Sequence, residues 1–116
     1  MKKPSRKHLI KRLDEEVSRI VRKKGFCEKC SSVLKKLNTS HYYSRTLKSV
    51  RWDFYNVKCT CVGCHFWLDG HPLEHTEFVK KRLGDISFDL LVQRANRPRK
   101  WEIYELQALL KELEGK

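Results

Sequence analysis

The chain lacks any long apolar run, and this absence argues against a protein with a transmembrane helix. No stretch of its 116 residues approaches the ~18 consecutive apolar residues that a transmembrane helix needs. Its first residues, MKKPSRKHLIKR, are charged and contain no apolar segment, so we expect no secretory signal. These absences predict a cytoplasmic protein with no membrane partner, in which thiols stay reduced.

Acidic residues are scarce relative to basic ones. The chain has 14 Asp and Glu against 26 Lys and Arg, which gives a formal net charge of +12. A surplus of this size indicates nucleic acid or an anionic membrane as a partner. Residues 1–24 hold ten of the basic residues and only three acids. These charges fit either a solvated helix face or a phosphate-binding helix, and the imbalance favours the second.

The apolar spacing predicts a single, mostly helical α+β domain. Hydrophobic residues make up 40% of the chain and charged residues 34%, which is typical of a globular protein with a modest core. Pro72 is well placed to open one helix, and Asp85 to cap the next. We expect helices over 5–24, 62–68, 72–83, 86–96 and 100–114, and strands over 38–44 and 50–59 that form a hairpin.

Five cysteines, an odd number, argue against a set of disulfides. Four of them form two CxxC pairs, Cys27 with Cys30 and Cys61 with Cys64. A CxxC turn supplies two thiolates at the spacing that tetrahedral zinc requires, so we predict one structural Zn²⁺ bound by all four. The 30 residues between the pairs leave room for a hairpin. Cys59 is left over, and we expect it to act as a small buried apolar residue.

The segment from Cys61 to His65, CVGCH, also fits the signature for covalent haem attachment. Such haems are attached outside the cytosol and usually need a second axial ligand, often Met. The only Met of this chain is Met1. We therefore favour the zinc site.

The order of the polar residues between the two CxxC pairs gives the strongest indication of function. His41 follows a short predicted strand, Asn56 comes fifteen residues later, and His65 directly follows Cys64. The segments RWDFYN and CVGCHFWLDGHP surround these residues. From about Cys27 to Leu83, this pattern resembles the HNH endonucleases of the ββα-metal (His-Me finger) superfamily. The two segments look like those of small phage and bacterial members with a CxxC/CxxC zinc.

The resemblance implies a DNA phosphodiester hydrolase that needs Mg²⁺ or another divalent ion in addition to the structural zinc. His41 would be the general base that activates water, because the pKa of imidazole lies near working pH. His65 would be the main ligand of the catalytic metal, which would stabilise charge on the scissile phosphate. Asn56 would either tie the loop to the strand or touch the metal. The zinc-stapled core would span residues 26–84, between a basic helix (1–25) and C-terminal helices (85–116).

One position departs from the family pattern. Many HNH enzymes carry Asp or His directly before the base, as a second metal ligand, whereas this chain has Ser40. We expect another residue to replace it. His71, at the end of the helix that carries His65, is our first choice, with Asp53 and Asp69 as alternatives.

Three basic residues between the predicted strands are candidates for binding nucleic acid: Arg45, Lys48 and Arg51. We expect Arg45 to reach a phosphate, since a guanidinium binds one with two N–H groups. Arg51 and Trp52 suggest instead a buried ion pair between Arg51 and Asp53 beside an aromatic ring. We expect His8 and His75 to lie on the surface.

Two other functions remain open. The same fold could be a zinc-stapled DNA-binding module without catalysis, in which His41 is idle. It could also be a protein-interaction adaptor that docks through its C-terminal helices. We expect double-stranded or branched DNA as the partner and either a monomer or a homodimer, since the apolar stripe of the last predicted helix could serve either.

Overall fold

The computed structural model of the chain describes residues 4–116. Within this range it contains five helices and one antiparallel pair of strands, which is the mostly helical α+β class that the sequence predicts. In chain order the elements are α1 (Arg6–Arg22), β1 (Leu37–His41), β2 (Val57–Cys61), α2 (Val62–Asp69), α3 (Pro72–Leu83), α4 (Asp85–Ala95) and α5 (Ile103–Glu114).

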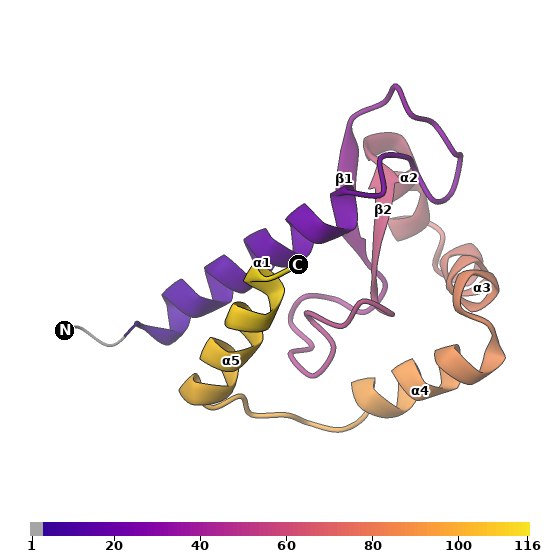
Figure 1. Cartoon of the computed structure of the whole chain (residues 1–116). Coiled ribbons are helices and arrows are strands. Elements are labelled where there is room, and N and C mark those ends of the chain that lie inside the picture. The colour runs from indigo at the N-terminus through magenta and orange to yellow at the C-terminus, as the bar shows by residue number, and fades with distance from the viewer. Residues whose placement is uncertain (1–3) are drawn as a thin grey trace.

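The first and last helices lie side by side, on one side of the hairpin, and α3 and α4 extend from the other (Figure 1). The Ser5 hydroxyl caps α1 by accepting a hydrogen bond from the His8 amide, and α1 ends close to Gly25, as predicted. One apolar stripe of α1 packs against α5 in the larger of the two hydrophobic clusters. The buried members of the stripe and of α5 are Leu9, Leu13, Val17, Leu106 and Leu113.

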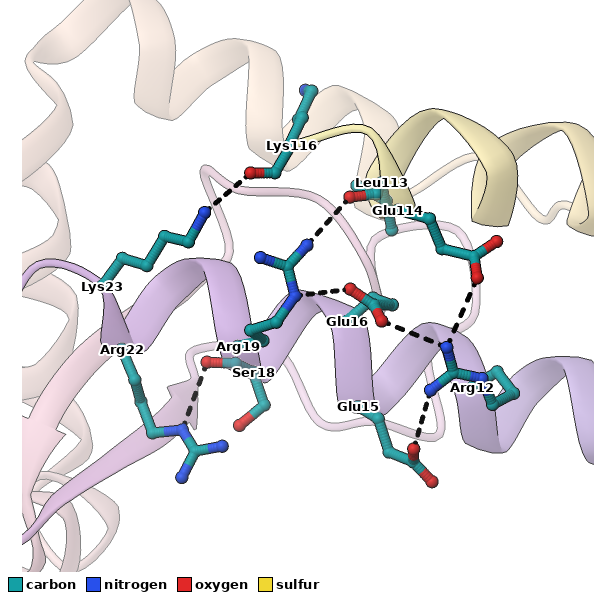
Figure 2. Close-up of polar contacts among 10 residues, drawn as sticks. All are labelled: Arg12, Glu15, Glu16, Ser18, Arg19, Arg22, Lys23, Leu113, Glu114 and Lys116. Carbon is teal, nitrogen blue, oxygen red and sulfur yellow. Dashed lines mark hydrogen bonds and ion pairs between the residues drawn. The ribbon is translucent and has the colours of Figure 1, made fainter.

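Polar contacts hold α1 and α5 together at the edge of this core (Figure 2). Arg19 donates one hydrogen bond to Glu16 at 2.7 Å and another to the carbonyl of Leu113 at 3.2 Å. Arg12 reaches both Glu16 and Glu114. Two of the basic side chains of α1 therefore hold the first helix to the last.

The second strand is shorter than the sequence predicts. β2 pairs with β1 with His41 opposite Val57 and Leu37 opposite Cys61. Residues 50–56, predicted to be part of that strand, form successive turns instead. The Asp53 carboxylate accepts a hydrogen bond from the Tyr55 amide at 2.9 Å, an Asx turn that competes with an extended backbone. Trp52 packs into the α1–α5 cluster rather than across a strand.

The helices after the hairpin begin and end close to their predicted positions. Pro72 opens α3, as predicted. Asp85 does not cap α4: Gly84 occupies the N-cap position at φ +83°, a left-handed conformation that suits glycine, and Asp85 lies in the first turn. The carboxylate still lies near the positive end of the helix. A second cluster joins these helices to the loop before β2, with Val50, Val79, Phe88, Leu91 and Ala95 buried.

Among residues 4–116, no helix is both long enough and apolar enough to cross a bilayer.

Candidate metal centre and active site

The four cysteines of the two CxxC pairs come together at one point. Their sulfur atoms all lie within 4.8 Å of one another, and the Sγ atoms of Cys30 and Cys61 are 3.9 Å apart. Zinc binds thiolate sulfur at about 2.3 Å, and a tetrahedron of that size has sulfur–sulfur edges of about 3.8 Å. The chemistry of the donors and their spacing therefore both fit a single tetrahedral metal ion.

The local backbone explains how the two turns present their thiols. In each pair the amide of the second cysteine points at the sulfur of the first at 3.4 Å, from Cys30 to Cys27 and from Cys64 to Cys61. Cys61 is also the N-cap of α2, so the second turn is continuous with that helix. Burial alone would raise the pKa of the Cys27 thiol, but hydrogen bonds from nearby backbone amides outweigh it and lower the pKa to about 6. A thiolate at neutral pH is the form that binds a metal.

Cys59 does not join the cluster. It is fully buried on β2, as predicted for a small apolar residue, and its amide donates to the Glu28 carboxylate at 2.7 Å. Burial raises the pKa of the Cys59 thiol, and the negative charge of Glu28 raises it further. Cys59 therefore remains a protonated, packed side chain.

A cavity of about 670 Å³ lies between α1, the hairpin and α2. Both His41, at the end of β1, and His65, on α2, line it. The arrangement predicted from the sequence requires these two rings to face a common space, and the structure gives the two residues one cavity to line. Asp14, Arg45, Arg51 and Asp69 also line this cavity.

One nitrogen of the His41 ring is fixed by the backbone. Nε2 lies 3.0 Å from the carbonyl oxygen of Arg51, and since a carbonyl can only accept, Nε2 carries the proton. Nδ1 is then the basic nitrogen of the ring. Burial lowers the pKa of His41, and the positive charges of Arg45 and Lys58 lower it further against the opposing effect of the Arg51 carbonyl. At neutral pH the ring is therefore able to accept a proton.

Asn56 holds the loop that carries the base. The side chain is fully buried; its oxygen accepts from the Tyr43 amide at 2.7 Å, and its nitrogen donates to the carbonyls of Tyr43 and Val50. Of the two roles that the resemblance left open, this geometry matches the tie between loop and strand. Both polar atoms of the amide are held by the backbone, and Asn56 does not line the cavity that His41 and His65 share.

Asp14, which sequence reasoning did not single out, organises the loop from the other side. Its carboxylate accepts two hydrogen bonds from Arg51, at 2.7 and 3.0 Å, one from the indole of Trp52 at 2.9 Å and one from Arg45 at 2.7 Å. The ion pair expected between Arg51 and Asp53 does not form, because Asp53 pairs with Arg94 at 2.6 Å. Only one sequence feature indicates that Asp14 binds these side chains: it is one of three acids in the strongly basic segment 1–24.

We expect Asp14→Asn to lower the free energy of unfolding by about 1–3 kcal/mol, because the largely buried Arg51 side chain loses its charged partner. Burial acts to raise the pKa of Asp14, but the hydrogen bonds that it accepts outweigh it and hold the pKa below its usual value. The contribution to stability is therefore present above about pH 4 and is lost as the pH falls through the lowered pKa. Urea unfolding at pH 7 and at pH 3 measures both effects.

The matched control is Glu15→Gln, which removes an exposed carboxylate one residue away; among residues 4–116 its one ion pair is with Arg12. This change should alter stability by less than about 0.5 kcal/mol. Equal effects of the two substitutions at pH 7 would contradict the role assigned to Asp14.

The carboxylate of Asp69 lies beside His65, although from the sequence His71 is our first choice for the second metal ligand. Its Nε2 lies 3.3 Å from the Asp69 carboxylate, one helical turn later on α2, and both side chains line the cavity. His71 instead stacks on Trp67 at 4.1 Å and contacts the Trp67 carbonyl through Nδ1, and it is not part of the cavity wall. Asp69 is thus better placed than His71 to share an ion with His65.

Ser40 and His75 are both buried. Ser40 has no exposed surface and, one residue before His41 on β1, points to the opposite face of the hairpin. His75, expected at the surface, is only 5% exposed and packs edge-on against Tyr42 at 5.1 Å. Burial and the positive charge of Lys58 lower the pKa of His75 to about 4. Its spacing of four residues from buried Val79 was the helical signal that would have revealed it.

The basic residues of the loop divide into two kinds. Arg45 is held by Asp14 but keeps 58% of its side chain exposed, whereas Arg51 is only 15% exposed. Lys48 is exposed but does not line the cavity, and its carbonyl accepts the indole N–H of Trp101. Of the two candidates that line the cavity, Arg45 is the more exposed.

Comparisons of the chain with models of protein families, with curated proteins and with solved structures found no match.

Proposed function

We propose that this protein is a metal-dependent DNA endonuclease whose catalytic loop and helix are held by a structural zinc. The observation that carries the proposal is that His41 and His65 line one cavity, and that His65 directly follows Cys64 of the four-cysteine cluster. A general base and a metal ligand that line the same cleft are the two groups that hydrolysis of a phosphodiester needs.

His41 would remove a proton from the attacking water. The hydrogen bond from its Nε2 to the Arg51 carbonyl supports this role, because it fixes the tautomer and leaves Nδ1 basic. Asp14 would act as a positioning residue: it binds the side chain of Arg51, whose carbonyl holds the ring. Arg45, bound to the same carboxylate and largely exposed, would hold a phosphate of the substrate.

His65 and Asp69 would hold the catalytic ion, which when bound supplies positive charge to the scissile phosphate. Two protein ligands suffice if the phosphate and water complete the shell, as is usual for Mg²⁺. An imidazole next to a carboxylate also suits Mn²⁺. The four cysteines would hold Zn²⁺, since soft thiolates select it over these hard ions.

The position of Ser40 favours a second candidate, a zinc-stapled DNA-binding module without catalysis. Ser40 is buried on the far face of the hairpin and leaves the cavity without a ligand directly before the base. The surplus of basic residues would support binding in either case.

A plasmid-nicking assay of the zinc-loaded protein with Mg²⁺ or Mn²⁺ tests the proposal. We expect wild type to cut and His41→Ala to lose about 10²–10⁴-fold of the rate, the usual contribution of a general base, with DNA binding unchanged. The lowered pKa of His41 should also place the acidic limb of the pH–rate profile below about pH 6.5.

His8→Ala is the control, since His8 is exposed near the start of α1 and is not part of the cavity wall. It should cut as wild type does. DNA binding without cleavage by wild type, with either ion, would contradict the nuclease and favour the binding module.

A further inference from the structure

A second cavity, of about 410 Å³, lies on another part of the surface, between the end of α1, the first CxxC turn and α3. Its volume is within the range of cavities that bind small organic groups. None of the side chains assigned to the nuclease site lines it. It therefore needs its own explanation.

The wall of this cavity carries four basic side chains and one acid. The acid, Glu28, is fully engaged: its carboxylate accepts from Lys24 at 3.0 Å, from Arg82 at 2.7 Å and from the Cys59 amide at 2.7 Å. Within residues 4–116, Lys29 and Lys81 form no ion pair with a carboxylate. Two ammonium groups thus remain available for an anion.

Aromatic rings are interleaved with these charges. Phe26 is 37% exposed, and Phe78 forms part of the same wall. Beside the cavity, Lys29 lies 4.3 Å from the ring centre of Trp67, which is itself exposed. An exposed ring among cations offers a stacking surface for a flat group and charge for a phosphate.

We propose that this cavity binds a nucleotide of an unpaired DNA strand, with its base against Phe26 and its phosphates on Lys29 and Lys81. Unpaired DNA is the form that fits, because bases within a duplex are already stacked on both faces and cannot pack on a protein ring. An acidic peptide could satisfy the lysines but would make no use of the exposed ring. The proposal names a substrate feature for the proposed nuclease, and it concerns binding alone.

Fluorescence anisotropy of a labelled oligo-dT with the full, zinc-loaded chain tests the proposal. Phe26→Leu keeps an apolar side chain but removes the flat face, and we expect it to weaken oligo-dT binding at least five-fold while duplex binding changes by less than two-fold. Replacing Lys29 and Lys81 together by Gln should reduce the slope of log affinity against log salt by about 1.4, the loss of two phosphate contacts to a single strand.

Lys100→Gln with Lys111→Gln is the matched control, since both lysines are exposed and lie outside this cavity. The pair should affect oligo-dT and duplex binding equally. The proposal is overturned if Phe26→Leu binds oligo-dT as wild type does, or if a poly-glutamate peptide displaces the oligonucleotide equally well from wild type and from Phe26→Leu.

This result is independent of the nuclease test. His41→Ala should bind oligo-dT as tightly as wild type. If binding depends on Phe26 but no DNA is cleaved, this proposal stands and only the nuclease is contradicted. If DNA is cleaved but Phe26→Leu binds oligo-dT as wild type does, the nuclease stands and this proposal is contradicted.

Discussion

Withdrawal of the metal from the four-cysteine site should unfold the segment from Cys27 to α2. Binding of structural zinc by a small domain is worth about 10–16 kcal/mol, comparable with or larger than the ~5–15 kcal/mol by which whole domains are stable. The site joins two turns that are 30 residues apart in the chain, and Cys61 also caps α2. Circular dichroism during titration with a strong chelator, with released zinc followed by a metallochromic indicator, measures the effect.

Two cysteine variants separate the ion from the thiols. Cys30→Ser removes one donor and should prevent stoichiometric zinc binding. Cys59→Ala removes a buried thiol outside the cluster and should bind one zinc as wild type does, with a loss in stability of about 1 kcal/mol. Full release of zinc without any change in the circular dichroism spectrum or in the melting temperature would show that the ion does not hold the fold.

Replacing Lys58 by Met should stabilise the protein by roughly 2–4 kcal/mol at pH 7. Lys58 is 1% exposed on β2, and within the described residues its Nζ has no hydrogen-bond partner. Burial, the largest cause, and the positive charge of Arg82 together lower the pKa of Lys58 to about 7, against the attraction of Asp69 and Glu28. A methionine of similar length keeps the packing and removes the buried amine.

The sign of the pH dependence distinguishes this mechanism from better packing. Between pH 7 and about 10.4 the unfolded chain binds more protons at this position than the folded one, so the stability of wild type rises with pH in that interval. The advantage of Lys58→Met should therefore shrink from pH 7 to pH 10. Urea unfolding at both values, with the exposed Lys111→Met as control, measures it; a variant less stable than wild type at pH 7 would show that the amine has a partner.

Those parts of the fold that depend on local signals were predictable from the sequence. The apolar stripe, Ser5 and Gly25 located α1 to within two residues, and Pro72 located the start of α3. The two CxxC pairs predicted a cluster that the structure forms. In each case the information lies within a few residues or in a fixed spacing.

Contacts between distant segments were not predictable in the same way. Aromatic and β-branched residues favoured a strand from Val50 onward, yet Trp52 is drawn out of it by Asp14, 38 residues earlier. Neither the choice of Asp14 over Asp53 as the partner of Arg51 nor the burial of Lys58 has a local sequence signal. The first depends on how α1 meets the loop before β2, and the second on how the hairpin packs against the helices that carry Asp69 and Arg82. No short stretch of sequence contains this information.

The packing of α1 on α5 makes the two ends of the described chain depend on each other. Leu106 and Leu113 cover the same stripe of α1 whose neighbouring residue, Asp14, holds the loop behind His41. Deletion of α5 would therefore expose the apolar stripe of α1, almost a hundred residues upstream. It would also loosen the loop whose Arg51 carbonyl orients His41, the proposed general base.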